Sequence, residues 1–276
     1  MKAAHEALLN PLYAVILGIV EGITEYLPVS STGHLILVSR LLGLEGEGVD
    51  AFAVVIQLGA ILAVVVQYRR LLWQRTTGLV KGERASIALL VALVLGFVPT
   101  ALAGLFLRKA IKAVLFGAKP VAIALVVGGI VMIVVEALRA KKQDQGLDGL
   151  EHVTPWRAFV IGLGQCVSMW PGSSRSMCTI VAGQLTGLST ATAAEFSFLL
   201  GLPTLGAATL YEAYKSRAAL VGVGGLNLAI GLVVSFLVAW AVIAGFIAYL
   251  KKRGLAPFGV YRILLGVVVF VVLVRS

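Results

Sequence analysis

Long apolar segments alternate with short charged ones along most of the chain. The segments 86–107 and 218–250 contain no Asp, Glu, Lys or Arg and are 22 and 33 residues long. As helices rising 1.5 Å per residue, both can cross a hydrocarbon core of about 30 Å. Shorter or charge-flanked apolar segments cover 50–68, 120–138, 195–214 and 257–275. The pattern predicts six transmembrane helices.

Two further apolar regions, 8–43 and 156–188, are each interrupted in the middle. The first contains Tyr-Leu-Pro-Val-Ser-Ser-Thr-Gly-His at 26–34, and the second contains Trp-Pro-Gly-Ser-Ser-Arg-Ser at 170–176. Proline followed by small hydroxyl residues ends one helix and caps the next. We therefore expect two re-entrant helix-turn-helix hairpins, each of which enters the membrane and returns to the same side.

The two interrupted regions are similar to each other. Aligned residues of the two regions differ by 144 in residue number before the prolines and by 143 across them. The difference is 144 again between the segments 52–61 and 196–205. The aligned pairs are Glu21 with Gln165, Glu25 with Met169, Tyr26 with Trp170, Pro28 with Pro171, Ser30 with Ser173 and Ser31 with Ser174. This predicts two homologous halves, 1–140 and 141–276, each with one hairpin and three membrane helices.

Three crossings after each hairpin would place the second half upside down relative to the first. We therefore predict an all-α integral membrane protein with an inverted-topology repeat in one compact membrane domain. Two hairpins that enter from opposite faces would meet near the midplane. Irregular backbone at that depth has to be buried in protein or line a water-filled cavity.

Composition and charge agree with a membrane location. The 276 residues are 59% apolar and 13% charged, whereas about a quarter of a soluble domain is charged. The net charge of +10 does not indicate nucleic-acid binding, because the cations lie at the ends of apolar segments without interleaved aromatics. Such a distribution is typical of loops beside anionic membrane lipid.

The cations also predict the orientation of the chain. Eleven lie on one side, at positions 69, 70, 75, 81, 84, 139, 141, 142, 251, 252 and 253, and eight on the other, at 2, 108, 109, 112, 119, 215, 217 and 275. The positive-inside rule places the first group in the cytoplasm. Both termini and the first hairpin would then face outward.

Ionisable side chains inside apolar regions are the candidates for chemistry. Glu21 and Glu25 lie one helical turn apart and would repel each other unless a divalent cation, a shared proton or an arginine offsets their charges. The structural alternative is that both reach the headgroup region as solvated charges. In the same way, Ser30 and His34 of the first turn could be a helix cap and a packed histidine.

The second turn places Arg175 among hydroxyl groups and is suited to bind an oxyanion. A helix N-terminus offers free N–H groups, Gly172 allows close backbone approach, and a guanidinium can bind two phosphate oxygens at once. The alternative for Arg175 is a buried ion pair with Glu21 or Glu25. The two uses are compatible if a metal joins the site.

The chain contains two specific motifs. The first is Glu21-x-x-x-Glu25 followed by the Pro-x-Ser-Ser-x-x-His segment that ends at His34. The second is the Pro-Gly-x-Ser-Arg-Ser-x-x-Thr segment that ends at Thr179. The motifs resemble those of the undecaprenyl-diphosphate phosphatase family of the bacitracin-resistance type, and the resemblance extends over essentially the whole chain. It implies hydrolysis of undecaprenyl diphosphate to undecaprenyl phosphate and inorganic phosphate, with a divalent cation, Mg²⁺ or Ca²⁺. It also implies the bacterial inner membrane and leaves a homodimer open. The loop charges, with the first hairpin entering from outside, predict an active site on the outer side.

Roles follow for the candidate residues. Glu21 and Glu25 would hold the metal, or position and deprotonate the nucleophile, which is His34, Ser31 or metal-bound water; His34 could instead be the proton donor. The predicted phosphate-binding residues are Ser30, Gly172, Ser173, Ser174, Arg175, Ser176 and Thr179.

Two other functions fit parts of the pattern. Inverted repeats with interrupted helices are common in transporters, so a transporter or prenyl-lipid flippase is the main alternative. The other family of membrane lipid phosphatases uses a histidine after its second-motif arginine, and no histidine follows Arg175 in this chain. A purely structural protein would not need an arginine in a turn at membrane depth.

Overall fold

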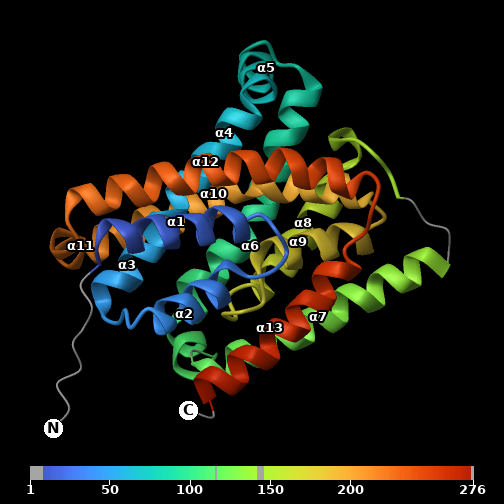
Figure 1. Ribbon diagram of the computed structural model, residues 1–276. Helices are drawn as coiled ribbons and strands as arrows, with labels where there is room; N and C mark the ends of the chain where they lie inside the picture. The colour runs from blue at the N-terminus through green and yellow to red at the C-terminus, as the bar shows by residue number, and fades with distance from the viewer. Residues whose placement is uncertain (1–8, 116, 142–145, 275–276) are drawn as a thin grey trace, which may run out of the picture.

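The computed structural model describes residues 9–115, 117–141 and 146–274, and these residues form an all-helical protein (Figure 1). Within these ranges no strand forms, although one β-bridge joins Leu147 and Leu188. The α-helices in chain order are α1 (Pro11–Thr24), α2 (Ser31–Leu41), α3 (Glu47–Val55), α4 (Gln57–Gln67), α5 (Arg69–Val80), α6 (Arg84–Leu115), α7 (Ala118–Lys141), α8 (Pro155–Val167), α9 (Arg175–Leu185), α10 (Thr190–Lys215), α11 (Arg217–Val223), α12 (Gly225–Leu250) and α13 (Ala256–Val274). A short 3-10 helix, Leu150–His152, precedes α8.

Five helical segments in the described ranges are long and apolar enough to cross a bilayer, as expected for a multi-pass membrane protein. They are Glu47–Gln67, Arg84–Leu107, Ala118–Lys141, Thr190–Lys215 and Gly225–Leu250. The apolar part of α13, Ala256–Val272, is shorter than these five. The sixth predicted span, 257–275, is therefore a helix up to Val274, with residue 275 outside the described residues, and its apolar part is shorter than the other spans.

One predicted helix is wrong in its bounds. The charge-free segment 218–250 is two helices, α11 and α12, because Gly224 between them has a φ of 83°. That left-handed conformation is open to glycine and interrupts the hydrogen bonds of a right-handed helix. The membrane helix therefore begins at Gly225.

The first helix of each hairpin, α1 or α8, begins with the same local arrangement. Asn10 accepts a hydrogen bond from the backbone N–H of Tyr13, and Pro11 is the first helical residue of α1. Thr154 and Pro155 repeat this at the start of α8. A polar N-cap followed by proline starts a helix without losing a backbone hydrogen bond. These pairs lie 144 residues apart, the offset of the sequence alignment.

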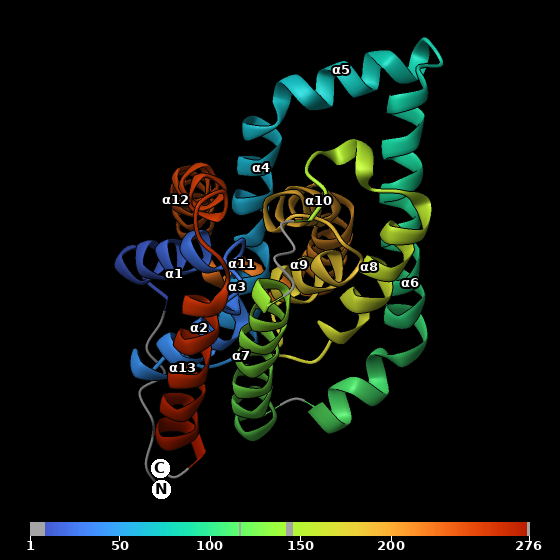
Figure 2. The same ribbon diagram turned by 90° about the vertical axis from the view of Figure 1, so that its right-hand side faces the viewer.

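Small residues allow the helices that carry the site to pack closely. A Cβ atom on Gly22 of α1 would lie 2.7 Å from the Val238 Cβ and 2.8 Å from the Ser235 carbonyl of α12. Helices α7 and α13 lie side by side in Figures 1 and 2, and a Cβ on Gly259 would lie 2.7 Å from the Gly129 carbonyl. Such contacts are typical of helix association in lipid.

A carboxylate of α7 caps the start of α13. Glu136 accepts a hydrogen bond from the backbone N–H of Ala256 at 2.9 Å and another from that of Leu255. A negative charge at a helix N-terminus is stabilising. This contact fixes the N-terminus of α13 and so helps to position the α13 residues that contact the two turns.

The exposed faces of the long helices are apolar. In α6, Leu105 and Phe106 are 78% and 80% exposed, and only 17% of the apolar part of this helix is buried in the protein. Side chains of this kind are suited to lipid rather than to water. The polar groups of the candidate site lie between the packed helices instead.

Candidate active site

The two interrupted regions form helix-turn-helix hairpins whose turns have the same backbone conformation. Ser30 and Ser174 are the N-caps of α2 and α9 and have φ angles of 74° and 70°. They are the only residues other than glycine with positive φ in the described ranges. A non-glycine residue held in an unusual conformation persists only when its surroundings stabilise it, and such residues are concentrated at functional sites.

This backbone geometry corrects the alignment across the prolines. Ser30 is equivalent to Ser174 rather than to Ser173, so the offset of 144 continues through the turns. The identical prolines misled the sequence comparison, whereas the N-caps determine the register. As a consequence, Ser31 and Arg175 are the equivalent first residues of α2 and α9.

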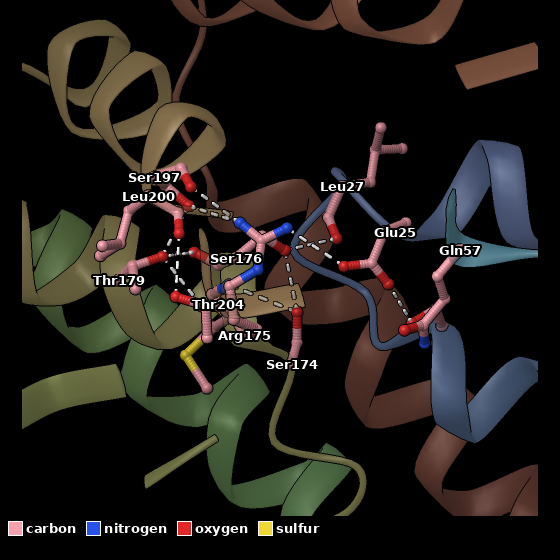
Figure 3. A network of polar contacts seen from close by, with 12 residues as sticks. Glu25, Leu27, Gln57, Ser174, Arg175, Ser176, Thr179, Ser197, Leu200 and Thr204 are labelled. Atoms are coloured by element: carbon pink, nitrogen blue, oxygen red, sulfur yellow. Dashed lines mark hydrogen bonds and ion pairs between the residues drawn. The ribbon is translucent and has the colours of Figure 1, made fainter. Parts of the chain in front are cut away.

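Hydroxyl groups join the two turns directly (Figure 3). Ser176 donates a hydrogen bond to the Leu27 carbonyl of the first turn at 2.9 Å, and its Oγ lies 3.0 Å from the Ser174 Oγ. Ser176 is fully buried, and Ser30 and Ser174 accept from the N–H groups of Gly33 and Met177. These three predicted phosphate-binding serines therefore hold the turns in shape.

Arg175 forms an ion pair with Glu25 across the two hairpins. Its Nη2 lies 3.1 Å from the Glu25 Oε1, and the side chains are only 8% and 4% exposed. The Nη1 of Arg175 donates to the carbonyl of Ser197 at 2.9 Å and to its Oγ at 3.2 Å, and the guanidinium lies 5.4 Å from the centre of the Tyr26 ring. The structure thus shows the carboxylate pairing that the sequence left open.

One donor of the arginine is still available. The Nε of Arg175 is buried and has no hydrogen-bond partner among the described residues. Buried N–H groups are normally paired, so an unpaired one marks a place for a ligand oxygen.

Ser31 donates a hydrogen bond to the second oxygen of Glu25. The distance from the Ser31 Oγ to the Glu25 Oε2 is 2.7 Å, and both residues are buried. A hydroxyl and a carboxylate at this distance have the geometry of a nucleophile and its general base. Glu25 therefore connects the hydroxyl of α2 to the guanidinium of α9.

Glu21 lies one turn before Glu25 and is fully buried. Neither of its carboxylate oxygens has a hydrogen-bond partner in the described part of the chain, and it is close enough to Glu25 for the two charges to repel each other. Two unpaired carboxylate oxygens fit a hard divalent cation. The described residues contain no cluster of three His, Cys, Asp or Glu side chains that could hold a metal, so substrate and water oxygens would have to complete its coordination.

His34 has a partner on each ring nitrogen. The Nδ1 lies 2.8 Å from the Ser30 carbonyl, and the Nε2 lies 2.6 Å from the Tyr261 hydroxyl of α13. Because a carbonyl only accepts, the Nδ1 carries the proton, and the Nε2 of a neutral ring accepts from Tyr261. The imidazole is thus held by Ser30 and Tyr261, while the Ser31 hydroxyl donates to Glu25.

The remaining predicted phosphate ligands have structural contacts. Thr179 is buried one turn into α9, and its Oγ1 lies 2.6 Å from the Ser197 Oγ, so it supports the serine that binds Arg175. A Cβ on Gly172 would lie 2.7 Å from the Val121 carbonyl of α7, so this glycine allows close packing on α7. Ser173 is buried, with its backbone N–H bonded to the Trp170 carbonyl.

Three contributors to the site were not predicted: Ser197, Tyr261 and Arg262, of which Arg262 donates hydrogen bonds to the Pro28 and Gly172 carbonyls of the two turns. Ser197 and Tyr261 are common residue types in helices, and no local pattern distinguishes them. Arg262 is an isolated charge in the apolar segment 257–275, which is the same signal that identified Arg175.

Comparison with known proteins identifies the family. The family model described as "Bacitracin resistance protein BacA" matches residues 14–268, which include both turns and every residue of the candidate site. The chain belongs to this family. Its resemblance to the family, first suggested by the two motifs, is thereby confirmed.

Curated relatives of the family are similar over most of their length. A protein of Sorangium cellulosum named undecaprenyl-diphosphatase is 57% identical over 93% of this chain and 84% of its own. Proteins of the same name from Sphingopyxis alaskensis and Novosphingobium aromaticivorans are 44% and 46% identical, over 91% and 92% of this chain and 94% and 95% of their own.

Proposed function

We propose that this protein is an integral membrane phosphatase that hydrolyses undecaprenyl diphosphate to undecaprenyl phosphate and inorganic phosphate. The observation that carries the proposal is the buried chain of contacts from the Ser31 hydroxyl through Glu25 to Arg175. This chain brings together a nucleophile, a base and a cation, which is more than binding alone needs. The relatives named undecaprenyl-diphosphatase support the same substrate.

In the reaction that we infer, the Ser31 Oγ attacks the terminal phosphorus of the diphosphate. A bond forms between this oxygen and phosphorus, the bond to the bridging oxygen breaks, and undecaprenyl phosphate leaves. The hydroxyl proton passes to the Glu25 Oε2, 2.7 Å away in the resting protein. Water then attacks the phosphoserine, releases inorganic phosphate and restores the Ser31 hydroxyl, while Glu25 returns its proton to solvent.

Proton transfer would also change the partner of Arg175. When Glu25 accepts a proton, its negative charge disappears and its attraction to the guanidinium, 3.1 Å away, weakens. At the same moment negative charge develops on the phosphoryl oxygens. Arg175 can then bind these oxygens with its Nε and with the donors released from Glu25, so that the transition state is stabilised more than the resting state.

A divalent cation, Mg²⁺ or Ca²⁺, is part of the proposal. Glu21 would be its main ligand from the protein, since the oxygens of Glu25 already bind Ser31 and Arg175. Diphosphate oxygens and water would complete the coordination, as is usual for Mg²⁺. When bound, the cation would neutralise part of the charge of the diphosphate.

The membrane arrangement that fits this function is also a proposal. We infer six crossings, with α13 as the shortest, and two re-entrant hairpins that meet inside the inverted repeat formed by 1–140 and 141–276. Both hairpins contain helices of 14 residues or fewer, which are too short to span a bilayer of about 30 Å. The charge bias of the loops favours an outward-facing site in the bacterial inner membrane.

Phosphate release by the purified protein in detergent, from a C55 prenyl diphosphate, tests the proposed function. Without a membrane there are no compartments, so transport cannot produce the signal, whereas a phosphatase yields one phosphate for each diphosphate consumed. An inactive protein in the presence of added Mg²⁺ or Ca²⁺ would contradict the proposal.

A further inference from the structure

Helix α13 places one arginine, Arg262, fully inside the protein. Its Nη1 donates to the Pro28 carbonyl at 3.2 Å, and its Nη2 donates to the carbonyls of Gly172 and Ala124 at 2.9 Å and 3.2 Å. These three carbonyls belong to the first turn, the second turn and α7. One side chain therefore connects both turns to a long membrane helix.

The two turn carbonyls occupy equivalent positions. Pro28 and Gly172 are 144 residues apart, and each stands two residues before a serine N-cap with positive φ, Ser30 or Ser174. Arg262 thus lies between the two halves of the chain and binds the same point of each. Rotation of either turn would break a hydrogen bond to the guanidinium.

This arrangement is unfavourable for stability alone. No carboxylate in the described part of the chain forms an ion pair with Arg262, and its Nε has no hydrogen-bond partner there. A buried charge without a counter-charge is costly, and an apolar side chain of similar volume is often at least as stabilising. Three backbone acceptors at fixed positions are, in contrast, what a planar guanidinium recognises better than any other side chain.

We propose that Arg262 is a positioning residue for phosphoryl transfer, which fixes the two turns so that Ser31 of α2 and Arg175 of α9 act on one phosphate. The inference rests on the proposed phosphatase function. Ser31 and Arg175 directly follow the two N-caps, so a shift of one turn relative to the other would separate the nucleophile from the phosphate-binding cation. Misplacement by about 1 Å can lower a rate about 100-fold.

Two substitutions and one matched control test this inference. Arg262→Met keeps the volume and removes all the hydrogen bonds, and Arg262→Lys keeps the charge but can bind fewer of the three carbonyls. Arg157→Gln is the control, because Arg157 also donates to two backbone carbonyls, those of Thr186 and His152. It lies at the start of α8, about 15 Å along the axis from the end of the helix that leads into the second turn. Each protein is assayed for phosphate release from undecaprenyl diphosphate, and its thermal unfolding is followed in the same detergent.

A positioning role predicts that kcat falls about 100-fold in Arg262→Met and by a smaller factor in Arg262→Lys, while KM changes less than kcat. Arg157→Gln should lose thermal stability but keep its kcat. The inference is wrong if both Arg262 variants fold and keep wild-type kcat, or if Arg157→Gln loses as much kcat as they do for a similar loss of thermal stability.

The test still decides the question if Arg262→Met does not fold. Should Arg262→Met not fold, the kcat of Arg262→Lys decides alone: a clear loss with a nearly unchanged KM supports the inference, and wild-type kcat contradicts it. Failure of the proposed function is separate, because then the wild-type protein itself would release no phosphate.

Discussion

Glu25 joins the two hairpins, because its two oxygens bind different partners, Ser31 and Arg175. Glu25→Gln keeps the size and one acceptor oxygen but removes the base, the counter-charge and the second acceptor. We expect kcat for phosphate release to fall by about 10² to 10⁴. Glu47→Gln, at an exposed position in α3, is the control and should keep wild-type kcat. Equal rates for Glu25→Gln and wild type would exclude Glu25 as the base.

The nucleophile can be identified from the bond that it forms. If the protein is quenched in acid during turnover, mass spectrometry should find one phosphoryl group on the peptide that contains Ser31, because phosphoserine survives acid. Ser31→Ala should abolish this modification, and Ser39→Ala, two turns further along α2, should not. An acid-labile phosphoryl group on His34 would instead identify the imidazole as the nucleophile.

At the scale of residues, the sequence singled out three charged groups and the hydroxyl groups of the two turns, and it missed the contributors from other helices, Ser197, Tyr261 and Arg262. Glu21, Glu25 and Arg175 were recognisable because ionisable groups are rare in apolar segments. The pairing of Arg175 with Glu25 rather than Glu21 depends on how two distant hairpins meet, which no local pattern records. Ser197 and Tyr261 lie on other helices, and their contribution follows only from tertiary packing.

At the scale of elements, close packing of α1 on α12 positions both glutamates. Gly22→Ala would place a methyl group 2.7 Å from the Val238 Cβ and 2.8 Å from the Ser235 carbonyl, so we expect a loss of about 1–3 kcal/mol in the free energy of unfolding and a lower kcat. Gly245→Ala in α12, with no atom within 4 Å of the new methyl group, should not be destabilising. Denaturant unfolding in detergent measures both, and equal stability would contradict the packing argument.

The elements themselves were largely predictable. Proline and hydroxyl residues correctly marked the breaks after α1 and α8, because their local chemistry ends and caps helices. The break at Gly224 was missed because glycine is also common inside membrane helices. The register of the two turns was wrong by one residue because matching prolines outweighed the N-caps, which only the backbone conformation reveals.

At the scale of the whole molecule, the proposed divalent cation can be tested through Glu21, whose carboxylate oxygens have no hydrogen-bond partner among the described residues. Treatment with a chelator should abolish phosphate release, and Mg²⁺ or Ca²⁺ should restore it. Glu21→Gln should raise the cation concentration that gives half-maximal activity, because a neutral amide binds the cation more weakly than a carboxylate. Full activity after chelation would exclude the cation from the reaction.

The membrane character of the molecule was evident from composition, whereas its interior was not. Apolar segments of sufficient length identify membrane helices without any knowledge of tertiary structure. Arg262 of α13 binds residues 234 and 90 positions away in the two turns, so this connection could not be found by comparing neighbouring residues. The function therefore depends most on the part of the structure that local patterns describe least.

The most direct test of the account compares phosphate release from undecaprenyl diphosphate by purified wild-type protein and by Arg175→Lys in detergent. The account predicts one phosphate for each diphosphate from the wild type and a rate at least about 100-fold lower for Arg175→Lys, because lysine cannot reproduce the fork of donors. Arg217→Lys, exposed at the start of α11, should match the wild type. A wild-type protein without activity, or an Arg175→Lys variant with wild-type kcat, would contradict the assignment of a phosphatase site to the two turns.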